Sequence, residues 1–67
     1  MRITLNGEPV SMPEPRLTLS ELLQRYPPAH RGYAVEVNGA VTTRRDHDRI
    51  EIREGDRVEI VTLVGGG

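Results

Sequence analysis

The sequence predicts an α+β fold in which one short helix packs on one face of a small mixed sheet of four or five strands. Apolar and polar residues alternate with a period of two near both ends of the chain, which is typical of strands with one buried face. Residues 19–25 instead carry apolar side chains at helical spacing. The core is expected to be marginal, because a domain of 67 residues buries only about 60% of the surface of its unfolded chain.

The N-terminal segment predicts a hairpin. Residues 1–5 alternate as one strand, and Asn6-Gly7 is a preferred pair for a type I′ turn, in which both residues have positive φ. Residues 10–12 continue the alternation on a second strand. Since Pro9 has no N–H to donate to a neighbouring strand, we expect this second strand to lie at an edge of the sheet.

The helix is predicted from its first turn. Thr18 and Glu21 form a capping-box pattern, in which each side chain accepts a hydrogen bond from the backbone N–H of the other residue. The apolar residues that follow share one face: Leu19, Leu22, Leu23 and Tyr26. The helix is expected to end before Pro27, because a residue that precedes proline disfavours the α conformation. No strand is predicted between Pro13 and the helix.

The second half of the chain predicts extended segments at 33–37, 41–43, 50–52 and 57–64, with a hairpin turn at Asn38-Gly39. The first and last strands are expected to pair in parallel at the centre of the sheet, because the helical crossover and the later strands separate them in sequence. The expected core consists of Ile3, Leu5, Val10, Leu19, Leu22, Leu23, Val35, Val37, Ile52, Val58 and Ile60.

The composition argues against several classes of function. Cysteine is absent, so disulfides and thiolate metal sites are excluded. His30 and His47 fall short of the three or four ligands of a zinc site, and we expect both to be solvated loop residues. With no signal peptide and no apolar run of about 20 residues, we expect no membrane span and a cytoplasmic location. A net charge of −1 with interspersed signs argues against nucleic-acid binding.

Charged residues concentrate between positions 44 and 51. Asp46, Asp48 and Glu51 could serve general acid–base chemistry, but charges that alternate in sign on a small open domain more often make a solvated face. The three arginines in 44–49 are expected to pair with Asp46 and Asp48. The alternative is that these arginines meet an acidic patch on a partner.

The chain ends in Val64-Gly65-Gly66-Gly67, and this sequence predicts a reactive tail. We expect residues 1–64 to form the domain and residues 65–67 to form a flexible glycine arm without a packing role. The carboxylate of Gly67 would have a pKa near 3.5 and would be ionised at neutral pH, so its chemistry needs prior activation, for example as an acyl-adenylate made with ATP. The alternative is a frayed terminus or a cloning scar.

Val61 and Leu63 lie just before this tail and are predicted on the outer face of the last strand, because Val58 and Ile60 occupy its core face. Apolar residues on an outer face at the base of a reactive arm indicate partner docking. The alternative is that both pack under a local loop or have no role in binding.

Several blocks then coincide in order: Asn6-Gly7, Thr18-Leu19-Ser20-Glu21-Leu22-Leu23, Val35-Glu36-Val37-Asn38-Gly39, Val41 with Arg44, Glu54-Gly55-Asp56-Arg57-Val58-Glu59-Ile60-Val61, and Val64-Gly65-Gly66-Gly67. Together they resemble the ThiS family, the sulfur carriers of thiamin biosynthesis, which are ubiquitin-like proteins with a β-grasp fold. The resemblance covers essentially the whole chain. It departs at Thr43 and His47, where the family often has proline and tryptophan, so no role is carried over for that tryptophan.

The resemblance implies a cycle in which the chain is a cosubstrate and not an enzyme. A ThiF-like adenylating enzyme would use ATP and Mg²⁺ to activate the carboxylate of Gly67, and the carrier itself would bind no cofactor and no metal. A sulfur donor enzyme would convert it to a thiocarboxylate, and a ThiG-like thiazole synthase would receive the sulfur. Two alternatives stay open: a related carrier for molybdopterin or for tRNA thiolation, and a ubiquitin-like interaction module that carries no sulfur.

Overall fold

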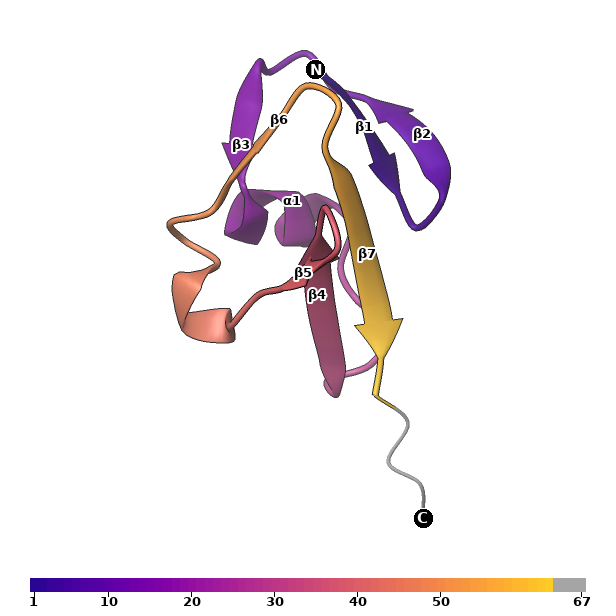
Figure 1. Cartoon of the computed structure of the whole chain (residues 1–67), viewed down its shortest axis with the longest axis vertical. Coiled ribbons are helices and arrows are strands. Elements are labelled where there is room, and N and C mark those ends of the chain that lie inside the picture. Colours follow the sequence, from indigo (N-terminus) through magenta and orange to yellow (C-terminus); the bar gives the residue numbers. More distant parts are fainter. Residues whose placement is uncertain (64–67) are drawn as a thin grey trace.

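The structure, a computed structural model, describes residues 1–63 (Figure 1). The elements in chain order are β1 (Arg2–Leu5), β2 (Glu8–Ser11), β3 (Arg16–Thr18), α1 (Leu19–Arg25), β4 (Tyr33–Val37), β5 (Ala40–Val41), the 3-10 helix η1 (Arg44–Asp46), β6 (Glu51–Arg53) and β7 (Arg57–Thr62).

The main sheet has five strands in the order β2-β1-β7-β4-β5. The first and last strands, β1 and β7, are parallel neighbours at its centre, with Leu5 opposite Val58, and the other pairs are antiparallel. Strand β2, which contains Pro9, lies at an edge. The predicted fold class, central parallel pair and edge strand are therefore confirmed.

Two asparagine–glycine turns fasten the last strand from both sides. Asn6 and Asn38 each have φ of 51°, and the glycines that follow them also have positive φ, as type I′ turns require. The side-chain Oδ1 of Asn6 accepts a hydrogen bond from the backbone N–H of Ile60 at 2.7 Å, and that of Asn38 accepts from Arg57 at 2.9 Å. Each turn therefore also satisfies a backbone donor of β7.

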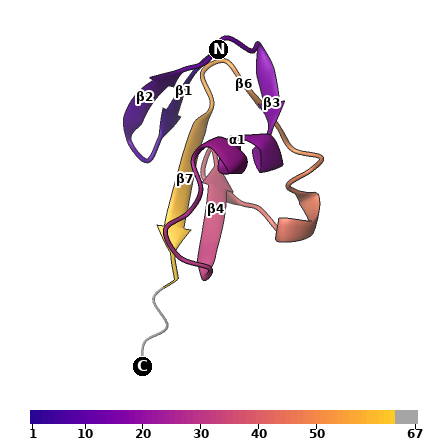
Figure 2. The same cartoon turned by 180° about the vertical axis from the view of Figure 1, so that it is seen from behind.

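Helix α1 has the predicted bounds and the predicted cap. Thr18 Oγ1 accepts from the backbone N–H of Glu21 at 3.1 Å, and Glu21 Oε1 accepts from the backbone N–H of Thr18 at 2.9 Å. The helix crosses one face of the sheet, as the view from behind shows (Figure 2). The opposite face, which we call the outer face, is seen in Figure 1.

A second, two-stranded sheet of β3 and β6 was not predicted. Leu17 lies opposite Ile52 in this antiparallel pair, and both side chains are buried. Strand β3 has three residues with one buried side chain, so it is too short to show a period of two. The paired strands β3 and β6 cover one end of the core, next to the start of α1.

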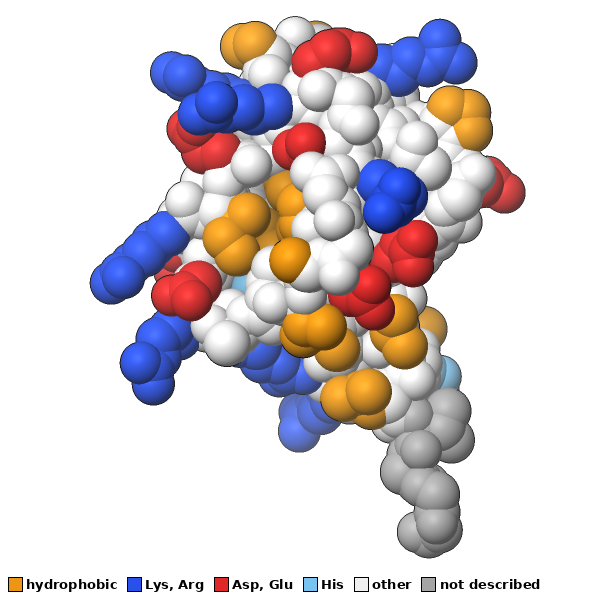
Figure 3. Space-filling view, in the orientation of Figure 1, with side chains coloured by type: hydrophobic (Ala, Val, Ile, Leu, Met, Phe, Trp, Pro, Cys, Tyr) orange, Lys and Arg blue, Asp and Glu red, His pale blue; other side chains and the backbone are white. Residues whose placement is uncertain are grey.

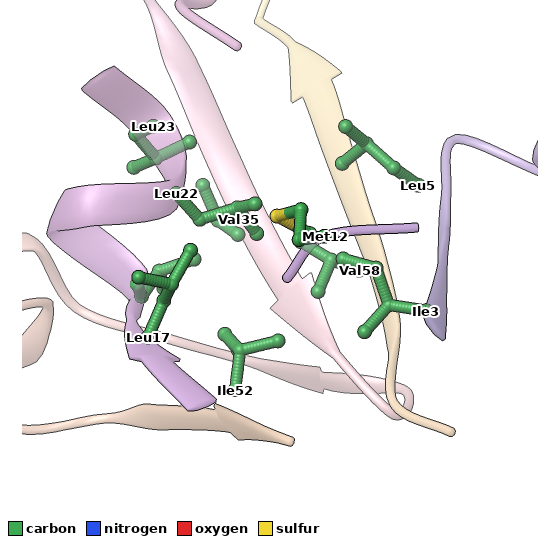
Figure 4. Packing of buried hydrophobic residues seen from close by; sticks show 10 residues of the cluster. Ile3, Leu5, Met12, Leu17, Leu22, Leu23, Val35, Ile52 and Val58 are labelled. Atoms are coloured by element: carbon green, nitrogen blue, oxygen red, sulfur yellow. The ribbon is translucent and has the colours of Figure 1, made fainter. Parts of the chain in front are cut away.

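The core lies between α1, the main sheet and this second sheet (Figure 4). Its buried apolar residues are Ile3, Leu5, Met12, Leu17, Leu19, Leu22, Leu23, Val35, Ile52 and Val58. Met12 and Leu17 were not predicted. Val10, Val37 and Ile60 were predicted in the core but are only partly buried, since a helix of seven residues leaves parts of the inner face uncovered.

Candidate functional site

The outer face of β7 carries exposed apolar side chains close to its end. Val58 is buried and Ile60 is half-buried towards the core, whereas Val61 and Leu63 keep 40% and 58% of their surface exposed. The predicted assignment of the two faces is therefore correct. Val61 lies opposite Ala34 of β4, and this pair extends the apolar area to the neighbouring strand. We call Ala34, Val61 and Leu63 the outer apolar surface (Figure 3).

The last described residue is held by the loop that precedes β4. The backbone N–H of Leu63 donates to the carbonyl of Gly32 at 2.8 Å, which continues the pairing of β7 with β4 by one step. A Cβ at position 32 would lie 3.2 Å from the carbonyl oxygen of Leu63, so a side chain there would crowd this contact. The residue before the predicted tail thus has a defined position. Val64, Gly65, Gly66 and Gly67 lie outside the described residues.

An acidic pair borders the outer apolar surface on the side away from Leu63. Glu36 of β4 lies directly opposite Glu59 of β7, and like charges in this position destabilise a sheet. Arg57 Nε approaches Glu59 at 3.8 Å and offsets part of the repulsion. Figure 3 shows acidic side chains next to the lower apolar patch of this face.

Arginine lies at the start of β4, where the side chain of Tyr33 packs against the core. The guanidinium of Arg44 sits 4.3 Å from the centre of the Tyr33 ring, which is a cation–π contact, and it donates to the backbone carbonyl of Arg31. Arg31 directly precedes Gly32, the residue that pairs with Leu63. In Figure 3, basic side chains, which can only be arginine because the chain has no lysine, lie beside and below the lower apolar patch.

The prediction that the arginines of 44–49 pair with Asp46 and Asp48 is wrong. Asp46 accepts from the hydroxyl of Thr43 at 2.8 Å, and Asp48 accepts from the hydroxyl of Ser20 at 2.5 Å. None of the ion pairs within residues 1–63 involves an arginine of this segment. The two carboxylates therefore fasten the loop through hydroxyl groups and leave these arginines without an acidic partner in the described chain.

His47 is buried, which also corrects the expectation of a solvated histidine. The hydroxyl of Thr42 donates to the carbonyl of Val35 at 2.9 Å, so the imidazole Nε2, 3.1 Å away, donates to that hydroxyl. Burial lowers the pKa of His47, and the charge of Arg44 lowers it further. The buried His47 ring thus packs in the protein interior at a position where the family often has tryptophan. Residues 1–63 contain no cluster of three metal-ligating side chains.

A groove of about 550 Å³ lies on the inner face, between the β1–β2 hairpin, β7 and the loop that follows α1. Its walls are mainly apolar and include Val10, Tyr26, Pro27 and Ile60, and Glu8 is the one charged residue among them. Among residues 1–63, this lining has neither a nucleophile with an adjacent base nor a pair of carboxylates. The groove therefore has no catalytic constellation, and sequence reasoning did not predict it.

The arrangement of the sheet and the helix defines the class of protein. A five-stranded mixed sheet with a central parallel pair, a single crossover helix and a last strand that leads into a glycine-rich end is the ubiquitin-like β-grasp fold. No helix in the described part of the chain has the length and hydropathy to cross a membrane.

Comparison with known proteins places the chain within this class. The model of the ThiS family matches residues 3–67, and the chain belongs to this family. Its members are small sulfur carrier proteins of thiamine biosynthesis. The resemblance to the family is thus confirmed.

Solved structures agree with this assignment. The crystal structure of a thiamine biosynthesis protein (ThiS) from Geobacter metallireducens superposes with a TM-score of 0.90 at 35% identity, and the match covers 100% of both chains. The solution structure of a thiamine biosynthesis protein from the same organism gives a TM-score of 0.79 at 35% identity and covers 100% of this chain and 88% of that one.

Two curated relatives differ in length. A thiazole synthase of Magnetococcus marinus is 40% identical over 67 residues, which are 100% of this chain but only 20% of that protein. The uncharacterized protein ycf40 of Porphyra purpurea is 38% identical over 65 residues, which cover 97% of this chain and 90% of the relative. The chain therefore spans a fifth of the first relative and most of the second.

Proposed function

We propose that the chain carries sulfur as a thiocarboxylate on Gly67 and delivers it for the thiazole ring of thiamin. The observation that carries this proposal is the match to the ThiS family, which extends to residue 67 and so includes the tail. The fold supports it, because a strand held on both sides ends beside an exposed apolar surface. Such an arrangement presents a tail to a partner without requiring any catalytic side chain.

The chemistry has two steps. One oxygen of the Gly67 carboxylate attacks the α-phosphorus of ATP, and pyrophosphate leaves, which gives an acyl-adenylate. A sulfur nucleophile from a donor then attacks the acyl carbon and AMP leaves, so that one oxygen of the original carboxylate departs with AMP and sulfur takes its place. ATP and Mg²⁺ belong to the partner enzyme in this scheme. The resulting sulfur is soft and nucleophilic, as a thiolate is.

The partners follow from these steps: a ThiF-like adenylating enzyme, a sulfur donor enzyme and a ThiG-like thiazole synthase. The thiazole synthase of Magnetococcus marinus supports the last of these, because a region covering 20% of its length is similar to this chain. We expect the cycle to run in the cytoplasm, where ATP is available.

Docking would use the outer apolar surface. Leu63 and Val61 lie one and three residues before the tail, so a partner that covers them also receives the arm at a fixed distance. When a partner removes such exposed apolar area from water, the burial stabilises the complex. Glycine at 65–67 has no Cβ and therefore allows a narrow channel to close around the arm.

Intact-mass spectrometry tests the proposal. The purified chain is incubated with the adenylating enzyme, ATP, Mg²⁺ and sulfide, and exchange of one oxygen for sulfur should add about 16 Da through the acyl intermediate. Omission of ATP should abolish the mass shift. Transfer of the sulfur to a molybdopterin or tRNA acceptor, and not to a thiazole synthase, would contradict the assigned pathway.

A further inference from the structure

Two arginines adjoin the backbone segment that pairs with the last described residue, Leu63. Arg31 adjoins Gly32, whose carbonyl binds the N–H of Leu63, and Arg44 is held against Arg31 through the carbonyl of that residue. The ring of Tyr33 lies under the Arg44 guanidinium at 4.3 Å. Arg44 is thus fixed in place by a stack and a hydrogen bond, although its side chain faces solvent. A fixed cation loses less conformational entropy on binding than a free one.

Neither guanidinium has a carboxylate partner in the described chain. The ion pairs within residues 1–63 use four other arginines: Arg16, Arg25, Arg53 and Arg57. The two acids nearest to Arg44 in sequence, Asp46 and Asp48, bind hydroxyl groups. The positive charge at the base of the tail is therefore available to a partner.

Charges of opposite sign lie at different points along the β4–β7 pair. Arg31 adjoins Gly32, the residue that pairs with Leu63, and Arg44 stacks on Tyr33 at the start of β4, on the core face of that strand. Glu36 and Glu59 face each other on the outer face, two residues further from Leu63 than Val61. A surface with this polarity favours one orientation of a partner and opposes the reverse one, because reversal would place like charges together.

The length of the tail limits what the arginines can touch. Four residues, 64–67, extend at most about 3.5 Å each, so the reacting carboxylate can lie about 14 Å from Leu63. With the arm fully extended, a nucleotide bound at that carboxylate would be out of reach of side chains at the base of the tail. The groups that meet Arg31 and Arg44 would instead surround the entrance through which the tail passes.

We propose that Arg31 and Arg44 form a recognition site for carboxylates at the rim of the arm-binding channel of the adenylating enzyme. The inference rests on the proposed function, and it specifies the partner's surface: acidic at the entrance and neutral or basic opposite Glu36 and Glu59. Its main effect is on the association rate, because complementary charges steer the encounter. Nucleic acid is disfavoured as the ligand, since the pair adjoins an apolar surface and an acidic pair instead of a basic stripe.

The test measures association kinetics between the full chain and the adenylating enzyme at about 50 mM and about 500 mM NaCl, where screening differs strongly. Arg31→Glu changes a side chain that makes no ion pair within residues 1–63, and Arg44→Gln removes the second charge. We expect each variant to lower the association rate at low salt, Arg31→Glu by about fivefold to tenfold, and to differ from the parent by less than about twofold at high salt.

Arg2→Glu is the matched control. It changes the net charge by the same amount as Arg31→Glu, but Arg2 lies on β1 before the pairing of Thr4 with Arg57, at the end of the sheet opposite to Leu63. The control should leave the association rate within about twofold of the parent, because opposite ends of the domain are separated by more than a Debye length.

Three results would overturn the inference. If Arg31→Glu and Arg2→Glu behave alike while Leu63→Ala weakens binding, the arginine site is wrong and the carrier function stands. If the parent chain does not bind the enzyme at all, both proposals fail together. If Arg31→Glu weakens binding to an oligouridine RNA but leaves enzyme binding unchanged, the arginines recognise nucleic acid instead.

Discussion

Truncation of Leu63 tests docking and should change the stability of the fold little, because this side chain is mostly exposed. The side chain is 58% exposed in the free chain, and complete burial of a leucine stabilises by about 1.5–3 kcal/mol, so a partner that covers it gains about 1–1.7 kcal/mol. Leu63→Ala should therefore raise the Kd for the adenylating enzyme roughly 5- to 20-fold. Leu63→Asp should weaken binding further, because a carboxylate must also be desolvated.

Val61 offers a contrast on the same face. It is 40% exposed and packs beside Ala34, so more of its apolar area already stabilises the domain and less remains for a partner. Val61→Ala should lower the free energy of unfolding more than it weakens binding, whereas Leu63→Ala should do the opposite. Two measurements on each variant, a Kd and a urea titration, separate the two contributions.

Val41→Ala is the matched control for exposed apolar area. Val41 is 70% exposed and also lies on the outer face, but it is on the edge strand β5, beside Glu36 and away from Val61 and Leu63. Its truncation should leave the Kd unchanged. A folded Leu63→Ala variant that binds within twofold of the parent would refute the assignment of this surface to docking.

Three further predictions concern the fold. Glu36→Gln removes one of two opposed carboxylates and should raise the free energy of unfolding by about 0.2–1 kcal/mol, as a urea titration would show; a loss of stability would mean that the pair with Glu59 is favourable. Asn38→Ala loses two side-chain hydrogen bonds and places alanine at φ of 51°, so we expect a loss of about 2–3 kcal/mol. Asn38→Gly keeps the turn conformation and should lose less; equal losses would exclude strain as a cause. His47 has a lower pKa in the folded chain than the ordinary 6.5, so the unfolded chain binds the proton first and the free energy of unfolding should fall as the pH decreases below 6.5. In urea titrations at several pH values between about pH 5 and pH 7, the free energy of unfolding of His47→Gln should depend less on pH than that of the parent. An equal pH dependence in the variant and the parent would contradict the lowered pKa of His47.

Local signals account for the parts of the fold that were predicted. The capping box at Thr18 and Glu21 and the Asn-Gly turns depend on residues within a few positions of each other, so the sequence alone determines them. The faces of β7 were likewise predictable, since polar and apolar residues alternate from Arg57 to Ile60 and this places Val61 on the face opposite to Val58.

The features that were missed depend on contacts between distant segments. Leu17 becomes a strand residue only through its pairing with Ile52. His47 is buried because the loop folds onto β4 through Thr42, and no neighbour in the sequence signals this. A charge run suggests local ion pairs, but Arg44 instead finds the ring of Tyr33. Local propensity and residue spacing carry no information on such contacts between distant segments.

The tail itself provides the most direct test of the central claim, that sulfur is carried on the carboxylate of Gly67. Deletion of Gly67 leaves a glycine carboxylate at the new end but shortens the arm by about 3.5 Å, and a misplacement of even about 1 Å can cost a hundredfold in rate. The parent and the shortened chain are incubated with the adenylating enzyme, ATP, Mg²⁺ and sulfide, and their intact masses are compared. The account predicts a gain of about 16 Da for the parent only, through the acyl-adenylate. Efficient thiocarboxylation of the shortened chain would contradict it.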